Sequence, residues 1–255
     1  MNEALNISNW ALAGLYLAFL IPLFLFQRFS LGLSKDLISS VTRMTLQLAV
    51  VGLYLQTLFD FANIWLNTAW LLVMMCVASW TICKQSGVNR KSLLTPIFIG
   101  QLVAMLFILP LLTIGVIQAD PWWQAQYLIP IAGMLLGNAL TANVLAIERF
   151  FSALKTRHAE LQYYVALGTP QPTKPFFKEA MTAALRPPLA SMSTLGIVAL
   201  PGMMTGQILG GTSPLLAVKY QLVIMVAIFI SVTLSVSTTL WLSSRAIIDD
   251  YGQLK

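Results

Sequence analysis

The sequence predicts an all-α, polytopic integral membrane protein. Of its 255 residues, 58% are hydrophobic and only 9% are charged, and the mean hydropathy is +0.78. Soluble domains carry about 25% charged residues, so this chain cannot cover a water-facing surface. Its apolar residues gather into stretches of about 20 residues, the length that a helix needs to cross a bilayer. Strands are not expected, because only helices and closed barrels satisfy their backbones in lipid.

Seven stretches are long and apolar enough to span a membrane. They cover residues 8–26, 37–58, 63–83, 94–117, 126–147, 189–211 and 215–243. No linker divides the chain and no internal repeat is visible, so residues 1–255 are expected to form a single transmembrane domain. The first ten residues contain no Lys or Arg, which argues against a secretory signal peptide.

The basic residues predict the orientation of these spans. All but Lys219 of the 15 Lys and Arg residues lie in or beside alternate connections or after the last span, with Arg43 near the start of the second span. The positive-inside rule places that side in the cytoplasm. The N-terminus is then outside and the C-terminus is cytoplasmic, with Trp122 and Trp123 at the outer interface.

One long polar connection, about residues 148–188, lies on the predicted cytoplasmic side. Helical spacing predicts a first helix over 148–167, stopped by Gly168 as a C-cap residue. A second helix is predicted over 175–185, starting at a proline and ending before Pro187 and Pro188. This connection is either a solvated linker or a docking element. Large apolar side chains favour docking: Leu161, Tyr163, Tyr164, Phe176 and Phe177.

The stretch Glu160–Gly168, "ELQYYVALG", resembles the coupling loop of ABC transporter permeases. In those proteins an Ala-Leu-Gly turn after a short helix inserts into a cleft on a separate ATPase subunit. The resemblance implies that Glu160, Ala166, Leu167 and Gly168 contact such a partner. A rigid helix–turn–helix could then transmit the motion of the ATPase to the spans.

Motifs for chemistry within the chain itself are missing from the sequence. There is no G-x-x-x-x-G-K-[ST], no H-E-x-x-H and no G-x-S-x-G, and the single histidine, His158, lies in the polar connection. The missing motifs argue against an enzyme. The resemblance to ABC permeases implies a transport subunit with no cofactor in this chain and with ATP and Mg on the partner subunit. The basic residues form no stripe beside exposed aromatic residues, so nucleic acid is not an expected partner.

Polar residues in the fifth predicted span are candidates for a substrate pathway, because such residues usually face other helices or water. These candidates are Asn138, Thr141 and Glu148. For Glu148, at the boundary of the span, a surface ion pair is the alternative. Ser231, Ser235 and Thr239 recur every four residues in the last span, a spacing that favours helix packing over a conduit.

The segment "LPGMMTGQILGG", residues 200–211, is the most unusual part of a predicted span. Pro201 is expected to bend the helix, which frees the carbonyl of Ile197 for the Ser193 or Thr194 hydroxyl. Three glycines at four-residue spacing predict a flat seam against another helix: Gly202, Gly206 and Gly210. Three neighbouring side chains complete the candidate pathway: Met203, Met204 and Gln207. The segment is either a tightly packed kinked helix or a hinge that lines a pathway. Whether the methionines bind a metal stays open.

Residues 200–221, "LPGMMTGQILGGTSPLLAVKYQ", look like the signature segment of the FetB family, and "GNALTANVLAIERF" and the Ala-Leu-Gly turn match that family in order. These are membrane subunits of an ABC-type system linked to bacterial iron homeostasis. The resemblance implies a multi-pass permease of the bacterial inner membrane. It also implies a homodimer with a separate ATPase, and export of iron or another metal. Plant relatives associated with aluminium tolerance and nucleotide-sugar transport leave a nucleotide sugar or another small solute as alternatives. An ATPase-independent secondary transporter or channel and a membrane scaffold also stay open.

Overall fold

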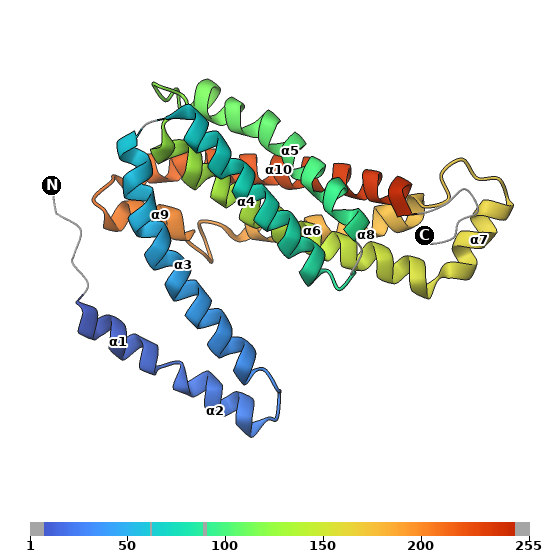
Figure 1. Cartoon of the computed structure of the whole chain (residues 1–255), viewed down its shortest axis with the longest axis horizontal. Helices are drawn as coiled ribbons and strands as arrows, with labels where there is room; N and C mark the ends of the chain where they lie inside the picture. Colours follow the sequence, from blue (N-terminus) through green and yellow to red (C-terminus); the bar gives the residue numbers. More distant parts are fainter. Residues whose placement is uncertain (1–7, 62, 89–90, 248–255) are drawn as a thin grey trace.

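The structure, a computed structural model, describes residues 8–61, 63–88 and 91–247. Every regular element in these ranges is a helix, which confirms the predicted all-α class. The order is α1 (Asn9–Leu17), α2 (Leu20–Arg28), α3 (Ser34–Phe61), α4 (Ile64–Gln85), η1 (Lys91–Leu93), α5 (Leu94–Pro110), η2 (Leu111–Val116), α6 (Ala125–Thr156), α7 (His158–Ala166), α8 (Lys174–Thr194), α9 (Gly202–Leu209) and α10 (Pro214–Ile247). Figure 1 shows this arrangement.

Local sequence explains where several of these helices begin. The Ser8 hydroxyl oxygen accepts a hydrogen bond from the Ala11 N–H at 3.2 Å, which caps α1. The side-chain oxygen of Asn63 accepts one from the Trp65 N–H at 2.9 Å at the start of α4. Such side chains satisfy donors that the first turn of a helix leaves without partners.

Six stretches of the described residues are long and apolar enough to cross a membrane. They are Asn9–Arg28, Ser34–Gln56, Ile64–Gln85, Leu94–Val116, Ala125–Thr156 and Pro214–Ala246. They match six of the seven predicted spans in position. In the fourth, the α-helix ends at Pro110 and continues as the π-helix η2. Orientation stays a prediction, and Arg90 and Lys255, two of its basic residues, lie outside the described part of the chain.

The core lies among α4, α5, α6, α8 and α10, where α5 and α10 pack along each other most extensively. These two helices approach closely at Gly100. A Cβ added to Gly100 would lie 2.2 Å from the Thr239 hydroxyl oxygen and 2.8 Å from the Ser235 carbonyl oxygen. A glycine at this position is therefore what allows the two backbones to approach so closely.

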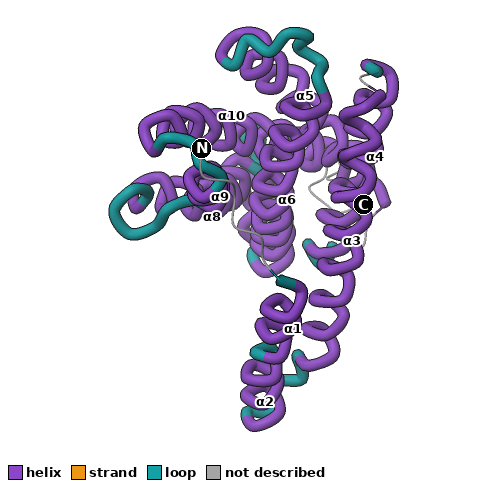
Figure 2. Tube along the Cα trace, turned by 90° about the vertical axis from the view of Figure 1, so that its left-hand side faces the viewer, coloured by secondary structure: helices purple, strands orange, loops and turns teal. Residues whose placement is uncertain are grey.

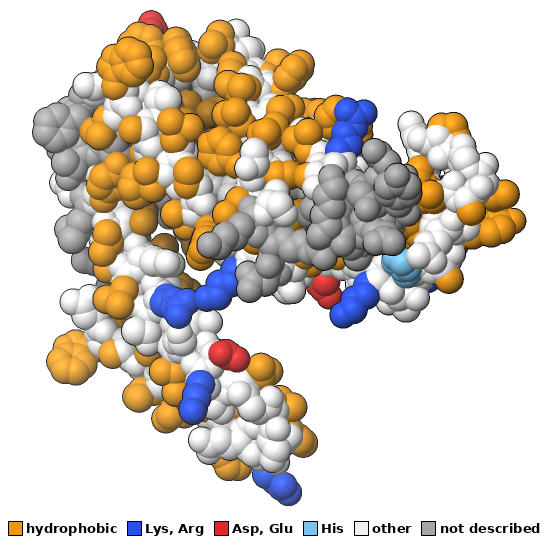
Figure 3. All heavy atoms as spheres, turned by 45° about the vertical axis from the view of Figure 1, so that its right-hand side comes forward, with side chains coloured by type: hydrophobic (Ala, Val, Ile, Leu, Met, Phe, Trp, Pro, Cys, Tyr) orange, Lys and Arg blue, Asp and Glu red, His pale blue; other side chains and the backbone are white. Residues whose placement is uncertain are grey.

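The helices α1, α2 and α3 form an arm that projects from this bundle (Figures 1 and 2). Neither α1 nor α2 buries a residue. The arm is joined internally, since the hydroxyls of Tyr16 and Thr45 lie 2.8 Å apart. Apolar side chains cover much of the surface in Figure 3, and Lys and Arg side chains are few and scattered on this face.

Contacts between helices give the direction of α10. Near the α7 end, the Asn143 side-chain N–H of α6 donates to the Ser235 hydroxyl at 2.9 Å. At the opposite end, Leu111 and Leu222 line one apolar cavity of about 330 Å³. Because α8 begins beside α7 and α10 begins at the opposite end, residues 174–213 must carry the chain along the bundle (Figure 1).

This passage lies where the seventh span, 189–211, is predicted, but it is not one helix. The chain leaves the helical conformation at Leu195, whose ψ is 136°, and re-enters it after Pro201, whose ψ is 144°. Pro201 is therefore the N-cap residue of α9, and the prediction of a bend inside a helix is wrong. The Ser193 and Thr194 hydroxyls donate to the carbonyl of Ala190 rather than to Ile197.

Candidate functional site

The polar connection 148–188 is more continuous with the bundle than its sequence predicts. Residues 148–156 extend α6, so the first predicted helix is two helices that meet at Arg157. The second predicted helix does not end before Pro187, since α8 runs through Pro187 and Pro188 to Thr194. The projecting element is thus α7 with the turn into α8, built directly on two helices of the bundle (Figure 1).

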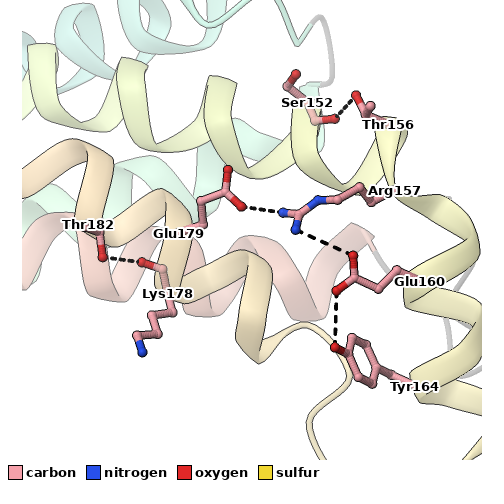
Figure 4. Close-up of polar contacts among 8 residues, drawn as sticks. All are labelled: Ser152, Thr156, Arg157, Glu160, Tyr164, Lys178, Glu179 and Thr182. Atoms are coloured by element: carbon pink, nitrogen blue, oxygen red, sulfur yellow. Dashed lines mark hydrogen bonds and ion pairs between the residues drawn. The ribbon is translucent and has the colours of Figure 1, made fainter.

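Arg157 joins α7 to both of its neighbours (Figure 4). Its guanidinium forms an ion pair with Glu179 of α8 and a second one with Glu160 of α7, at 3.6 Å. It also lies over the Phe176 ring, 4.9 Å from the ring centre. A planar guanidinium can hold two carboxylates and an aromatic face at once, which a lysine cannot do as well.

The hydroxyl of Tyr164 continues this network by donating to Glu160 at 3.2 Å. This hydrogen bond and the carboxylate's negative charge raise the pKa of Tyr164. Glu160, predicted to contact an ATPase, is therefore already engaged within α7 by Arg157 and Tyr164. Its role in this fold is to position α7, although one face of its side chain is still open to solvent.

The predicted docking side chains divide into two groups. Leu161 and Phe176 are fully buried and tie α7 and α8 to the core, so the expectation that they are free for a partner is wrong. Tyr164 and Phe177 are partly buried against the same core. Tyr163 and Leu167 are 62% and 61% exposed. These two form the apolar tip of the projecting element.

Gly168 ends α7 as the sequence predicts. Its φ is +66°, a conformation that favours glycine. Its N–H donates to the Val165 carbonyl at 2.9 Å, and the Thr169 N–H donates to the Tyr164 carbonyl at 3.1 Å. This is the Schellman arrangement, in which Leu167 is the C-cap residue and Gly168 follows it. The predicted end of the helix at Gly168 is confirmed, and the turn presents Leu167 and the exposed Ala166.

The candidate pathway residues of α6 lie on its exposed face. The Asn138 side-chain N–H donates to the Met134 carbonyl at 2.8 Å, and the Thr141 hydroxyl donates to the Gly137 carbonyl at 3.3 Å. Both donors are satisfied within their own helix, and their oxygen atoms can still accept hydrogen bonds. Glu148 forms no ion pair with any described residue.

The candidate residues of α9 pack instead against α10 and the core. Met203 is partly buried against the core, and Met204 is partly exposed. The side-chain oxygen of Gln207 is buried and has no hydrogen-bond partner among the described residues. No described hydrogen bond joins this group to Asn138, Thr141 or Glu148.

The glycine seam is shorter than predicted and has no partner within the described chain. Gly202 and Gly206 lie in α9, and a Cβ added to either would meet no atom within 4 Å. Gly210 is the C-cap residue of α9, before Gly211 with a φ of +91°. Its role is to end the helix rather than to extend a packing stripe.

The bundle contains a buried polar layer that is not predicted from the sequence. Gln101 of α5 is fully buried, and neither atom of its amide has a hydrogen-bond partner among the described residues. It follows Gly100, which contacts Thr239 and Ser235 of α10, and Ser235 is bonded to Asn143 of α6. The spacing of Ser231, Ser235 and Thr239 was read as packing, and all three are fully buried. An isolated amide in the apolar run 94–117 was the available signal for Gln101.

The described residues contain no group of three or more His, Cys, Asp or Glu side chains that could hold a metal ion. The polar atoms of the candidate pathway residues are amide and hydroxyl groups, methionine sulfurs and the single carboxylate of Glu148. Such groups can contact a cargo transiently. Tight resident binding of a divalent ion would call for carboxylates, thiolates or imidazoles.

Comparison with known proteins agrees with this architecture. Residues 9–248 match the family described as Uncharacterised protein family (UPF0014). The chain is 34% identical to "UPF0014 membrane protein slr1647" of Synechocystis, over 92% of each chain. It is 30% identical to "Probable iron export permease protein FetB" of Escherichia coli, over 98% of this chain and 95% of that one. It is 37% identical to "Protein ALUMINUM SENSITIVE 3" of Arabidopsis thaliana, over 84% of this chain and 77% of that one.

No solved structure matches the chain. The family match covers nearly the whole sequence and confirms the resemblance to the FetB family drawn from its motifs. It also agrees with the predicted location as a multi-pass protein of the bacterial inner membrane. The chain belongs to the UPF0014 family of membrane proteins, which includes the probable iron export permease FetB.

Proposed function

We propose that this chain is the permease subunit of an ABC-type transporter that exports iron or another metal ion. A separate ATPase subunit, which holds ATP and Mg, would drive it. The chain would act as a homodimer in the membrane, with two ATPase subunits on the α7 side. Transport, rather than catalysis, would be its activity.

The observation that carries this proposal is the α7–α8 element. It projects from the bundle, presents Tyr163 and Leu167 at its tip, and is held to α8 through Arg157 and Glu179. An apolar tip on a rigid support suits a partner that pushes or pulls, because motion at the tip reaches α8 without being absorbed by a hinge. A solvated linker would need neither the exposed apolar pair nor the ion pairs.

A metal cargo is supported by the names of two relatives, one concerning iron export and the other aluminium. We propose that Asn138, Thr141 and Glu148 of α6 line one part of the pathway. Met203, Met204 and Gln207 of α9 would line another part. Neutral oxygen and sulfur donors with only one carboxylate, that of Glu148, would bind a passing ion weakly, and weak binding favours release.

The discontinuous passage through α8 and α9 also supports transport. Transporters often place a broken helix at their substrate pathway, because a break in the helix exposes backbone groups there. A scaffold protein would have no need for such a break. A channel or secondary transporter would need the break but not the projecting α7 element.

The test is coupling to the ATPase. We expect the purified chain and its cognate ATPase to form a complex in lipid whose ATP hydrolysis changes when the chain is present. Leu167→Glu places a charge in the apolar tip, so it should abolish binding and coupling. The matched control, Gln162→Glu, puts the same charge on an exposed position of α7 outside the tip and should leave both intact.

Unchanged coupling in Leu167→Glu would contradict the docking role of the tip. Failure of the wild-type chain to bind any P-loop ATPase encoded with it, together with metal flux by the chain alone, would identify a secondary transporter instead. The two results are separable, since one concerns a residue and the other concerns the energy source.

A further inference from the structure

A row of hydroxyl groups lies inside the bundle, on the face of α10 that meets α5 and α6. It consists of residues four apart that are all fully buried: Ser231, Ser235, Thr239 and Ser243. Ser243 lies two residues before Arg245, at the α7 end of the bundle, and Ser231 lies about 18 Å farther along the axis at about 1.5 Å per residue. The hydrocarbon core of a bilayer is about 30 Å thick, so the row extends from that end past the middle of the membrane-spanning part.

Two amide side chains from neighbouring helices border this hydroxyl row and complete the buried polar layer. Asn143 of α6 is fully buried, and its side-chain N–H donates to the Ser235 hydroxyl at 2.9 Å, so its amide is directed at the row. Gln101 of α5 is fully buried at the same level, because the preceding Gly100 contacts Thr239 of α10. Polar side chains of three helices therefore meet where neither lipid nor bulk water reaches them.

Most polar atoms of this layer have no hydrogen-bond partner among the described residues. The unpaired atoms are both amide atoms of Gln101, the side-chain oxygen of Asn143 and the hydroxyls of Ser231, Thr239 and Ser243. A hydroxyl in a helix can usually donate to the carbonyl four residues earlier. The Thr233 and Ser237 hydroxyls of α10 do so, at 2.8 and 2.6 Å. The lack of partners is therefore a property of the buried face of α10, and it calls for a bound ligand.

The unpaired atoms specify the chemistry of that ligand. The Gln101 amide nitrogen can only donate, the two amide oxygens can only accept, and the hydroxyls can do either. A bare cation would leave the nitrogen without an acceptor, and no residue of the layer carries the negative charge that would offset a buried cation. An anion would leave the oxygens without donors. Water donates and accepts, and buried water molecules commonly pair such groups.

The spacing of the hydroxyl row also fits water. Consecutive residues of the row are about 6 Å apart along the helix axis. Two hydrogen bonds between oxygen atoms, each of about 2.7–2.8 Å, span nearly the same length. One water molecule can therefore bridge each pair of consecutive hydroxyls. The side chain that would crowd this seam from α5 is missing at Gly100, where a Cβ would lie 2.2 Å from the Thr239 hydroxyl oxygen.

We propose that a file of bound water molecules occupies the buried polar layer, from Ser243 at the α7 end to Ser231 beyond the middle of the membrane. Gln101 and Asn143 hold the file between α5, α6 and α10. The file is a hydrated route into the interior of one chain, separate from the exposed face of α6 that carries Asn138. This inference depends neither on the ATPase nor on a metal cargo, because the layer is complete within one chain.

The test places a thiol at the deep end of the file. In a Cys76→Ala, Cys83→Ala background, the protein in lipid carries Ser231→Cys and is transferred from ordinary to heavy water. The infrared S–H band should convert to S–D rapidly, because water reaches the thiol. The matched control is Val232→Cys, since Val232 is the next residue of α10, is 1% exposed and packs in the apolar core. Its exchange should be slower by about tenfold or more, because it requires local opening of the core.

Equal exchange rates for the two thiols would overturn the proposal, whether both are fast or both are slow. Thermal unfolding in detergent decides the matter if Ser231→Cys does not insert. Ser231→Ala removes a hydroxyl that water pairs, so it should lower the melting temperature more than Ser237→Ala, whose hydroxyl donates to a carbonyl of α10. In a dry layer, Ser231→Ala would remove an unpaired buried polar atom and raise the melting temperature, which would also refute the file. Neither measurement uses ATP, the ATPase or a metal, so its failure leaves the proposed function untouched.

Discussion

At the scale of single residues, Gly100 determines how α5 and α10 meet. An added methyl group would collide with the Thr239 hydroxyl at 2.2 Å and, more seriously, with the Ser235 backbone carbonyl at 2.8 Å. The hydroxyl can rotate away, but a carbonyl in the middle of α10 cannot. The two helices would have to separate along their whole contact, which includes the buried polar layer around Gln101.

We therefore expect Gly100→Ala to destabilise the protein by about 1–3 kcal/mol, the usual cost of overpacking a core. The control is Gly137→Ala on α6, where an added Cβ meets no atom within 4 Å. This variant should be neutral or stabilising by up to about 1 kcal/mol, because alanine favours the helix. Thermal unfolding of both variants in one detergent measures the difference. Equal stability would mean that α5 and α10 pack less closely than described.

At the scale of elements, the junction of α6, α7 and α8 combines weak interactions into a stiff unit. The side chains of Arg157 and Glu179 are 40% and 46% exposed, so their ion pair contributes only about 0–1 kcal/mol to overall stability. Its effect is local, because it fixes α7 where the chain turns at Arg157. The burial of Leu161 and Phe176 supplies the rest.

Glu179→Gln should leave the melting temperature nearly unchanged and speed amide hydrogen exchange across α7. The neighbouring variant Lys178→Gln also removes one charge from α8, but the Lys178 side chain forms no ion pair with a described residue. It should leave the exchange as it is. Exchange in α7 that is the same in both variants would show that the apolar contacts alone hold this helix.

The sequence was informative about these elements where a signal is local. Gly168 indicates the end of α7, because the turn needs a positive φ. An apolar run of sufficient length predicts a membrane span. It was misleading where packing overrides a local preference. Pro187 and Pro188 lack the N–H that a helix uses, yet α8 continues past them while Ala180 and Ala184 stay buried on its inner face.

At the scale of the whole molecule, hydropathy predicts where the chain crosses a membrane but not whether the crossing is continuous. Residues 189–211 are apolar enough for a helix, and only the backbone conformation at Leu195 and Pro201 reveals the break. What faces the exposed sides of α6 and α9 could not be predicted either, because the Asn138 side chain is bonded only within α6 and a Cβ added to Gly206 would meet no atom within 4 Å. The contacts of these exposed sides would be seen only in an assembly with a partner.

We propose that this chain moves a metal ion with the energy of a separate ATPase. The most direct test uses inverted membrane vesicles, in which export from the cell becomes uptake. We expect ferrous iron to accumulate only when ATP, the chain and its cognate ATPase are all present. No ATP-dependent uptake with both subunits, or uptake by the chain without ATP, would contradict this account.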